Sequence, residues 1–89
     1  MKICRHKQFI KEFKKTRITD GQFEKFVHYI NCLRDDTPLP DEAKDHALCG
    51  EYSDCRELHL GGDTLIIYLV NTDNEAILLR IGSHAQLFK

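Results

Sequence analysis

The sequence lacks any hydrophobic run long enough to cross a membrane. Its longest uninterrupted apolar run is residues 65–70, whereas a helix needs roughly 20 apolar residues to span a bilayer. Charged Lys2, Arg5 and Lys7 occupy the N-terminal stretch in which a secretory signal would have its apolar segment. We therefore expect no membrane helix, no membrane partner and a cytoplasmic location.

The sequence also lacks a CxxC pair, although it contains four cysteines. They are Cys4, Cys32, Cys49 and Cys55. Without a secretory signal, this pattern does not favour a disulfide framework. His46, Cys49, Cys55 and His59 offer the ligand types that zinc prefers, but not the spacing of a zinc finger. Two interpretations stay open: a small zinc-stabilised domain, or buried cysteines beside histidines that serve another purpose.

Internal repeats, Ser/Gly-rich linkers and low-complexity tracts are absent, and 89 residues suffice for one domain spanning residues 1–89. The net charge of −1 conceals an uneven distribution of charge along the chain. Residues 1–34 carry nine lysines and arginines against three acids, a net charge of +6, whereas residues 35–89 have a net charge of −7. This asymmetry indicates an N-terminal part that faces a polyanion or an acidic protein, although a solvated helix face has the same composition.

Apolar residues at helical spacing dominate the first third of the chain. They predict one amphipathic helix over residues 7–16 and another over residues 20–34. Thr19 or Asp20 is expected to cap the second helix at its N-terminus. The two prolines that follow end this helix and impose an extended connection.

Beyond the prolines the pattern changes to period two, which predicts a sheet. Residues 65–70 are apolar on both faces, as in a central strand that is covered above and below. Residues 55–60 and 76–81 are expected to form the neighbouring strands, each with two faces that differ in polarity. Residues 1–4 are a candidate edge strand. Short loops favour antiparallel hairpins. The predicted fold class is α+β, with two N-terminal helices packed on one face of a small antiparallel sheet.

Alternation along the strands predicts which side chains share a face. In residues 55–60, one face carries Cys55, Glu57 and His59. In residues 76–81, one face carries Ile77, Leu79 and Ile81, and the other carries Leu78 and Arg80.

Three histidines in the sheet half are candidates for proton transfer, because imidazole titrates near neutral pH. His46, His59 and His84, together with Arg80 and Asp63, could meet at the open edge of the sheet. Such a set fits cleavage of RNA by its own 2′-hydroxyl. A base removes that proton, a cation steadies the phosphate, and an acid protonates the departing 5′-oxygen. This chemistry requires neither a metal nor a nucleotide cofactor, so we expect no cofactor. Taken singly, each histidine would more often be a structural residue than a catalyst.

Five motifs in order resemble a known family. They are Pro38-Leu39-Pro40, Lys44-Asp45-His46-x-Leu48-x-Gly50, Arg56-x-x-His59, Ile67-Tyr68 and Arg80-x-Gly82-Ser83-His84-Ala85-x-Leu87-Phe88. These motifs resemble the YafQ branch of RelE-type toxins, the ribosome-dependent mRNA interferases of bacterial type II toxin-antitoxin modules. The resemblance implies a RelE-like fold, cleavage of mRNA in the ribosomal A site with inhibition of translation, and a cognate antitoxin.

The resemblance also implies site residues. His46, His59, Asp63 and His84 match the family's catalytic positions, and Phe88 matches its C-terminal aromatic residue. We expect His84 or His46 to act as the general acid, and His59 with Asp63 to form the base side. Arg80 would neutralise the scissile phosphate. Phe88 would stack on an unpaired base, or alternatively plug the core.

The binding partners expected from this resemblance are mRNA, the ribosome and an antitoxin. Because positive charge is confined to the helices, Lys11 and Lys14 are expected to contact ribosomal RNA phosphates. The antitoxin would lay an acidic or amphipathic segment over the basic helices or the sheet edge, and the free toxin would be a monomer. The alternatives are a weak or inactive RelE-fold module that binds an antitoxin, and the zinc-stabilised domain.

Overall fold

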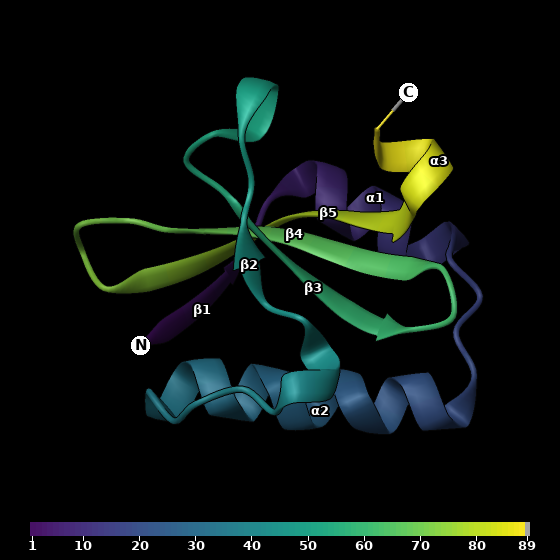
Figure 1. The fold of residues 1–89 in the computed structure, drawn as a ribbon, viewed down its shortest axis with the longest axis horizontal. Helices are drawn as coiled ribbons and strands as arrows, with labels where there is room; N and C mark the ends of the chain where they lie inside the picture. The colour runs from purple at the N-terminus through teal and green to yellow at the C-terminus, as the bar shows by residue number, and fades with distance from the viewer. Residues whose placement is uncertain (89) are drawn as a thin grey trace.

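The structure, a computed structural model, describes residues 1–88 and arranges them as helices on a five-stranded sheet (Figure 1). In chain order the elements are β1 (Lys2–Arg5), α1 (Lys7–Lys15), α2 (Asp20–Asp35), the 3₁₀ turn η1 (Asp41–Ala43), β2 (His46–Ala47), the 3₁₀ turn η2 (Gly50–Tyr52), β3 (Arg56–Gly61), β4 (Thr64–Val70), β5 (Glu75–Ser83) and α3 (His84–Leu87). Within this described part, no helix combines the length and hydrophobicity needed to cross a bilayer.

The strands lie in the order β1-β5-β4-β3-β2, so β4 is the middle strand, as its two apolar faces predicted. β2, β3, β4 and β5 pair in antiparallel fashion through hairpins and short connections. The expected edge strand at the N-terminus is present as β1, but it pairs with β5 in parallel. Both helices lie between β1 and the rest of the sheet in sequence, and such a crossover connection allows parallel pairing, which a tight hairpin does not.

Both long helices form where the apolar periodicity predicted them, and their ends are capped. The Thr19 hydroxyl accepts a hydrogen bond from the Gln22 backbone N–H, and the Gln22 side chain accepts one from the Thr19 N–H. This capping box satisfies two backbone donors that the start of α2 would otherwise leave unpaired. At the other end, Asp36 adopts a left-handed conformation with a φ of 55° and ends α2 two residues before the first proline.

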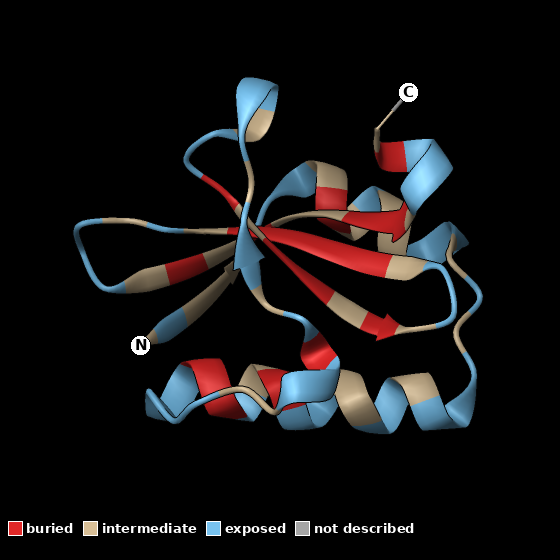
Figure 2. Cartoon of the chain, in the orientation of Figure 1, coloured by how far each residue is buried: buried red, intermediate tan, exposed pale blue. Residues whose placement is uncertain are grey.

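One hydrophobic core joins the helices to the sheet. Phe9 of α1, Tyr29 and Leu33 of α2, and Leu58 and Ile66 of the sheet belong to the same buried cluster. The rings of Phe13 in α1 and Phe26 in α2 also meet, with centroids 5.4 Å apart. This confirms that both N-terminal helices pack on one core. Figure 2 shows the buried residues concentrated along the central strands and the inner side of α2.

The opposite face of the sheet carries a second, smaller cluster that the short helix α3 covers. Leu65 and Ile67 of β4 pack there with Leu87 of α3, and Tyr52 of η2 and Phe88 pack against them. The sequence did not predict α3. Its four residues are stabilised by a capping box at Ser83 and Gln86, and by the buried Leu87 side chain.

A β-bulge in β5 corrects the predicted faces of that strand. Ile67 lies opposite Arg80 and the next residue of β4 lies opposite Leu78, so Leu79 is an extra residue. Leu78 and Ile81 consequently share the helix-side core, whereas strict alternation had put them on different faces. Arg80, opposite Ile67, projects onto the face that carries the second cluster. The predicted faces of residues 76–81 were wrong because a bulge interrupts the alternation of side chains.

We predict that the two ends of β4 respond differently to truncation. Ile66 is fully buried at 0% exposure, whereas Val70 is 42% exposed. Ile66→Ala should lower the free energy of unfolding by about 2–5 kcal/mol, because the cavity cannot fully collapse. The matched control Val70→Ala should lower it by less than about 1 kcal/mol. Urea unfolding of both variants measures the difference, and equal losses would contradict this placement of the core.

Candidate active site

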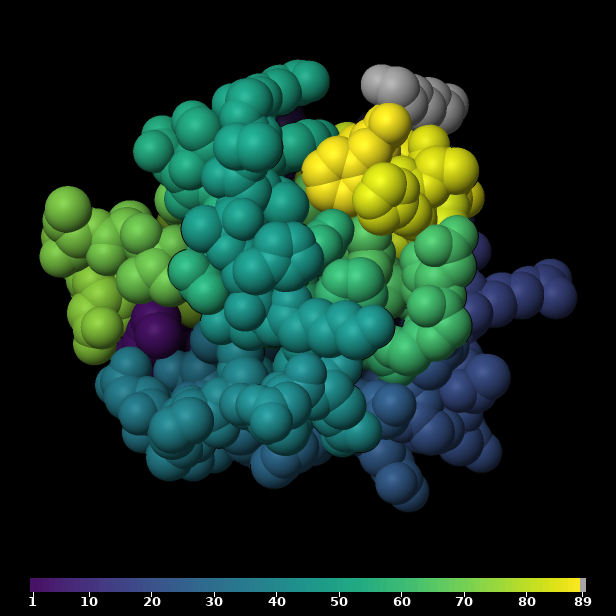
Figure 3. Space-filling view, in the orientation of Figure 1, coloured from purple at the N-terminus to yellow at the C-terminus, as the bar shows by residue number. Residues whose placement is uncertain are grey.

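The α3 face of the sheet brings together most of the candidate chemical residues. On this face the segment that carries η2 and the helix α3 stand next to one another, and Figure 3 shows their teal and yellow atoms side by side above the green hairpin of β3 and β4. Cys55, Leu65 and Ile67 form the apolar floor between them. The polar side chains of this face fall into two groups.

The first group is a pair of imidazoles on one buried carboxylate. Backbone pairing of β2 with β3 puts His46 opposite Glu57, and His59 follows two residues later on the same side of β3. His46 Nε2 lies 2.9 Å and His59 Nε2 lies 3.3 Å from the same Glu57 oxygen, Oε2. The two rings have centroids 6.2 Å apart. Glu57 is only 4% exposed; both imidazoles contact its Oε2 atom, whereas its Oε1 atom is buried with no hydrogen-bond partner among residues 1–88.

The start of β2 is anchored from the opposite side of the sheet. Asp45 accepts two hydrogen bonds from the Arg56 guanidinium, at 3.1 and 3.2 Å, and one from the Tyr68 hydroxyl at 2.7 Å. Partial burial together with the hydrogen bond to Asp45 raises the pKa of Tyr68 above its usual range, so the hydroxyl keeps its proton and donates. The anchor fixes the residue immediately before His46 and thereby limits the freedom of that imidazole.

Hydrogen-bond partners distinguish the two imidazoles. The Nδ1 atom of His46 lies 2.7 Å from the Lys44 carbonyl oxygen, while its Nε2 atom faces Glu57. Both ring nitrogens of His46 therefore face acceptors. His59 uses only Nε2 for Glu57. Its other ring nitrogen has no hydrogen-bond partner within residues 1–88.

The same three side chains are the candidate metal ligands. Ligand atoms of His46, Glu57 and His59 all lie within 4.8 Å of one another, and no other group of three such residues does so in the described chain. The alternative zinc set of His46, Cys49, Cys55 and His59 is not brought together, because neither cysteine belongs to this group. Cys55 belongs to the apolar floor, where it behaves as a small buried hydrophobic residue. Cys49 is exposed.

The second group stands on α3 and the η2 segment. The His84 and Phe88 rings pack one turn apart with centroids 4.8 Å apart, and the Tyr52 ring meets the edge of Phe88 at 5.7 Å. His84 is exposed, and its ring nitrogens make no hydrogen bond with any residue between 1 and 88. Phe88 is half-buried, so one part of its ring packs in the cluster while another part remains open to solvent.

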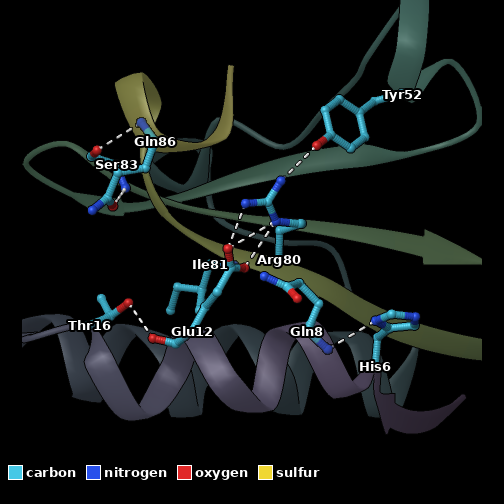
Figure 4. Close-up of polar contacts among 9 residues, drawn as sticks. All are labelled: His6, Gln8, Glu12, Thr16, Tyr52, Arg80, Ile81, Ser83 and Gln86. Carbon is cyan, nitrogen blue, oxygen red and sulfur yellow. Dashed lines mark hydrogen bonds and ion pairs between the residues drawn. The ribbon is translucent and has the colours of Figure 1, made fainter. Parts of the chain in front are cut away.

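Arg80 links this group to the basic helix α1 (Figure 4). Its Nε and Nη2 atoms donate to the Glu12 carboxylate, the shortest contact being 2.6 Å, and Nη1 donates to the Tyr52 hydroxyl at 3.1 Å. The Glu12 hydrogen bonds hold the pKa of Arg80 above its usual range despite partial burial. Burial raises the pKa of Glu12, but the hydrogen bonds from Arg80 and from the Ile81 N–H outweigh it, and the net pKa is lowered. Both groups therefore stay ionised.

The remaining predicted site residues lie outside these groups. Asp63 is exposed in the turn between β3 and β4, and no hydrogen bond or ion pair joins it to the other candidates in the described chain. Lys11 and Lys14 are exposed on α1. The structure thus brings His46 and His59 together, and it sets Arg80, His84 and Phe88 on the same face, but it leaves Asp63 apart.

Sequence reasoning did not identify Glu57, Tyr52 or Glu12 as site residues. A signal existed for Glu57, because strand alternation already put it on the face of His59. Tyr52 and Glu12 gave no such signal, since they reach Arg80 across 28 and 68 residues of sequence.

One face of the sheet in this small α+β protein carries histidines, a buried carboxylate and a guanidinium. Side chains of these types can transfer protons and stabilise negative charge. The family model described as "Bacterial toxin of type II toxin-antitoxin system, YafQ" matches residues 1–89. The chain therefore belongs to the YafQ family of bacterial type II toxins, which confirms the resemblance found in its motifs and the RelE-like fold class.

Individual relatives agree with this assignment. The mRNA interferase toxin YafQ of Escherichia coli K12 is 33% identical over 82 residues, which cover 91% of this chain and 88% of the relative. A copper-bound mutant toxin from Helicobacter pylori has 39% identity and a TM-score of 0.83, with 98% of each chain covered. The toxin in the E. coli DinJ-YafQ complex has 32% identity and a TM-score of 0.79, with 98% of this chain and 97% of that chain covered.

We predict that the Glu12–Arg80 pair makes stability depend on pH at the acid end. Because the folded pKa of Glu12 is lowered, its contribution is present above the unfolded value of 4.5 and is lost as pH falls through the folded value. Glu12→Gln should lower the free energy of unfolding by about 2 kcal/mol at about pH 7. The difference from the parent protein should shrink at about pH 3, where the parent's own carboxyl is protonated.

Urea unfolding at both pH values measures this effect. The matched control is Glu24→Gln, an exposed residue of α2 that has no ion pair among residues 1–88. A difference for Glu12→Gln that stays constant between the two pH values would refute the assigned pairing.

Proposed function

We propose that this protein is an endoribonuclease toxin that cleaves mRNA on translating ribosomes by metal-independent acid–base chemistry, and that a cognate antitoxin binds and restrains it. The observation that carries the proposal is the face of the sheet that holds His59 on its buried carboxylate together with Arg80 and His84. The name of the E. coli relative, an mRNA interferase toxin, and the crystallised DinJ-YafQ complex support the substrate and the partner.

The base in this proposal is His59. Glu57 accepts a hydrogen bond from His59 Nε2, which leaves Nδ1 as the basic nitrogen of the ring. A carboxylate that orients a histidine and stabilises its protonated form is a recurring arrangement in enzymes. His59 Nδ1 would remove the proton from the RNA 2′-hydroxyl, and the 2′-oxygen would attack the adjacent phosphorus to form a 2′,3′-cyclic phosphate. Glu57 is a positioning residue in this scheme, and it takes the place that Asp63 had in the sequence-based hypothesis.

The acid in this proposal is His84. The bond from phosphorus to the 5′-oxygen breaks as that oxygen takes a proton from the imidazolium. His84 is exposed and its ring nitrogens make no hydrogen bond with residues 1–88, whereas both nitrogens of His46 face Glu57 and the Lys44 carbonyl. This contrast favours His84 over His46 as the acid. His46 is then a positioning residue that contacts Glu57 from the neighbouring strand.

Arg80 and Phe88 complete the proposed site. Arg80 stays charged and is fixed on two sides by Glu12 and Tyr52, so it can stabilise the extra negative charge of the phosphorane without moving. Phe88 is half-exposed beside His84 and offers a ring on which an unpaired base can stack. Each proton transfer thus has a side chain, and the scheme calls for no metal ion.

Ribosome binding is assigned to the exposed lysines of α1. Lys11 and Lys14 lie on a helix whose last turn is basic, and its net charge suits the phosphates of ribosomal RNA. An acidic or amphipathic segment of the antitoxin would compete for this charge or cover the catalytic face.

We predict that His84→Ala abolishes growth arrest and lowers the rate of mRNA cleavage by about 10²–10⁴-fold, the usual contribution of a general acid. Stability should change by less than about 0.5 kcal/mol, because His84 is exposed. The measurement maps mRNA ends after incubation of purified protein with translating ribosomes. His28→Ala, which removes an exposed histidine of α2, is the matched control and should cleave normally.

Two outcomes would count against this function. If the parent protein leaves mRNA intact but still binds its antitoxin, the chain is an inactive RelE-fold module. If folded His84→Ala protein still arrests growth and cleaves at the parental rate, His84 is not the acid.

We also predict that Lys11→Glu combined with Lys14→Glu weakens association with ribosomes and makes it less dependent on salt, because two phosphate contacts are lost. Sedimentation with ribosomes over a series of salt concentrations measures both effects. The matched control reverses two exposed cations elsewhere, with Lys2→Glu and Arg5→Glu in β1. An unchanged salt slope would exclude α1 from the RNA contact surface.

A further inference from the structure

A polar groove lies beside the α3 face of the sheet, between α1 and the end of β5 where α3 begins. Its volume is about 590 Å³, within the range of small-molecule and nucleotide sites. One wall is the last turn of α1 and the residues after it, including Lys15 and Arg17, and the other wall includes Thr64, Ser83 and Gln86. Figure 4 shows α1 below this space, with Ser83 and Gln86 across from it and Arg80 between the two walls.

The lining of the groove carries a net charge of +2. Lys15, Arg17 and Arg80 are its cations, and Glu12 is its one acid. The Glu12 carboxylate is already occupied by Arg80 and by the Ile81 backbone N–H. Lys15 and Arg17 are exposed, and neither forms an ion pair or a side-chain hydrogen bond with any residue between 1 and 88. The uncompensated charge therefore belongs to two cations that face the groove.

Apart from Ile81, the remaining lining residues carry hydroxyls or amides. Thr64 and Ser83 offer hydroxyls, and Gln8 and Gln86 offer amides, while Thr16 already donates its hydroxyl to the Glu12 carbonyl and no aromatic ring among residues 1–88 lines the groove. Cations with hydroxyl and amide donors suit phosphate and ribose oxygens. The absence of an aromatic ring from this lining argues against a base-stacking pocket, because unpaired bases are generally held on aromatic side chains.

Arg80 makes the groove continuous with the catalytic face. Its guanidinium lines the groove and also donates to Tyr52, whose ring packs against Phe88 beside His84. An RNA strand whose scissile phosphate lies at Arg80 must continue to either side, and one side leads into the groove. We propose that this groove is a second RNA subsite that holds the sugar–phosphate backbone of nucleotides adjoining the cleaved bond.

This inference rests on the proposed nuclease function and extends it to the flanking part of the substrate. An acidic protein segment would also be attracted by Lys15 and Arg17. RNA is favoured because the groove adjoins Arg80, and because ribose hydroxyls and phosphates match its polar lining. The subsite recognises backbone, so it should increase affinity without selecting a base.

The test uses single-stranded RNA that cannot be cleaved, because the nucleotide at the scissile position carries a 2′-O-methyl group. A trinucleotide around that position is compared with oligonucleotides extended by three nucleotides on the 5′ or the 3′ side. Fluorescence anisotropy at low salt measures the affinity of the full-length protein. Lys15→Gln combined with Arg17→Gln should weaken binding of one extended oligonucleotide by about 10-fold and leave the trinucleotide unchanged. The slope of the logarithm of the binding constant against the logarithm of the salt concentration should become shallower by about 1.4, as expected for two lost phosphate contacts to a single strand.

The matched control is Lys2→Gln combined with Arg5→Gln, which removes the same charge from β1, away from the groove. It should leave the affinities for all three oligonucleotides unchanged. Arg17→Glu, which introduces an acid into the groove, should weaken the extended oligonucleotide further than Arg17→Gln does.

Three results would overturn the subsite. They are an equal loss for short and extended RNA, no loss for either, and a loss of antitoxin affinity with RNA binding unchanged. Failure of the nuclease function is recognised separately, because it appears as intact mRNA in the cleavage assay with the parent protein. If the parent cleaves mRNA and the groove variant binds extended RNA normally, only the subsite is wrong.

Discussion

A buried carboxylate shared by two imidazoles is the interaction on which the site depends. Glu57 is 4% exposed, and a carboxylate in that position is stable only with cationic or hydrogen-bonding partners. His46 and His59 supply those partners from neighbouring strands. The shared contact with Glu57 orients both rings, and of the two only His59 retains a ring nitrogen that faces no acceptor among residues 1–88. The contacts that hold the strands together therefore also orient the proposed base, and the Asp45 anchor on the other side of the sheet supports them.

A second constraint connects the basic helix α1 to the α3 face of the sheet. The bulge at Leu79 turns Arg80 toward that face, and Glu12 of α1 holds its guanidinium there. This arrangement relates the N-terminal positive charge to the site. The helix that carries Lys11 and Lys14 is joined through Glu12 to Arg80, the group proposed to meet the scissile phosphate, so the two proposed RNA contacts are held in a fixed relation. The polar groove beside Arg80 lies where the two surfaces meet.

Much of the fold was predictable from residue patterns. The two helices, the three long strands, the edge strand and the central place of residues 65–70 all followed from periodicity and turn residues, because these are local properties of the chain. The parallel pairing of β1 and the bulge in β5 did not follow, since both depend on how distant segments meet. For the site, the motifs predicted His46, His59, Arg80 and His84, whereas Glu12 and Tyr52 were invisible because their partner lies far away in sequence.

The sequence by itself determined the family, the secondary structure and the residue types available for proton transfer, because motifs and periodicity are carried by neighbouring residues. Only the tertiary structure decided which of these residues lie together. It placed His59 against Glu57, put acceptors beside both nitrogens of His46, kept Cys49 and Cys55 out of the His46–Glu57–His59 group, and left Asp63 in an exposed turn. Strand register and burial made those choices, and they emerge only when distant parts of the chain pack against one another.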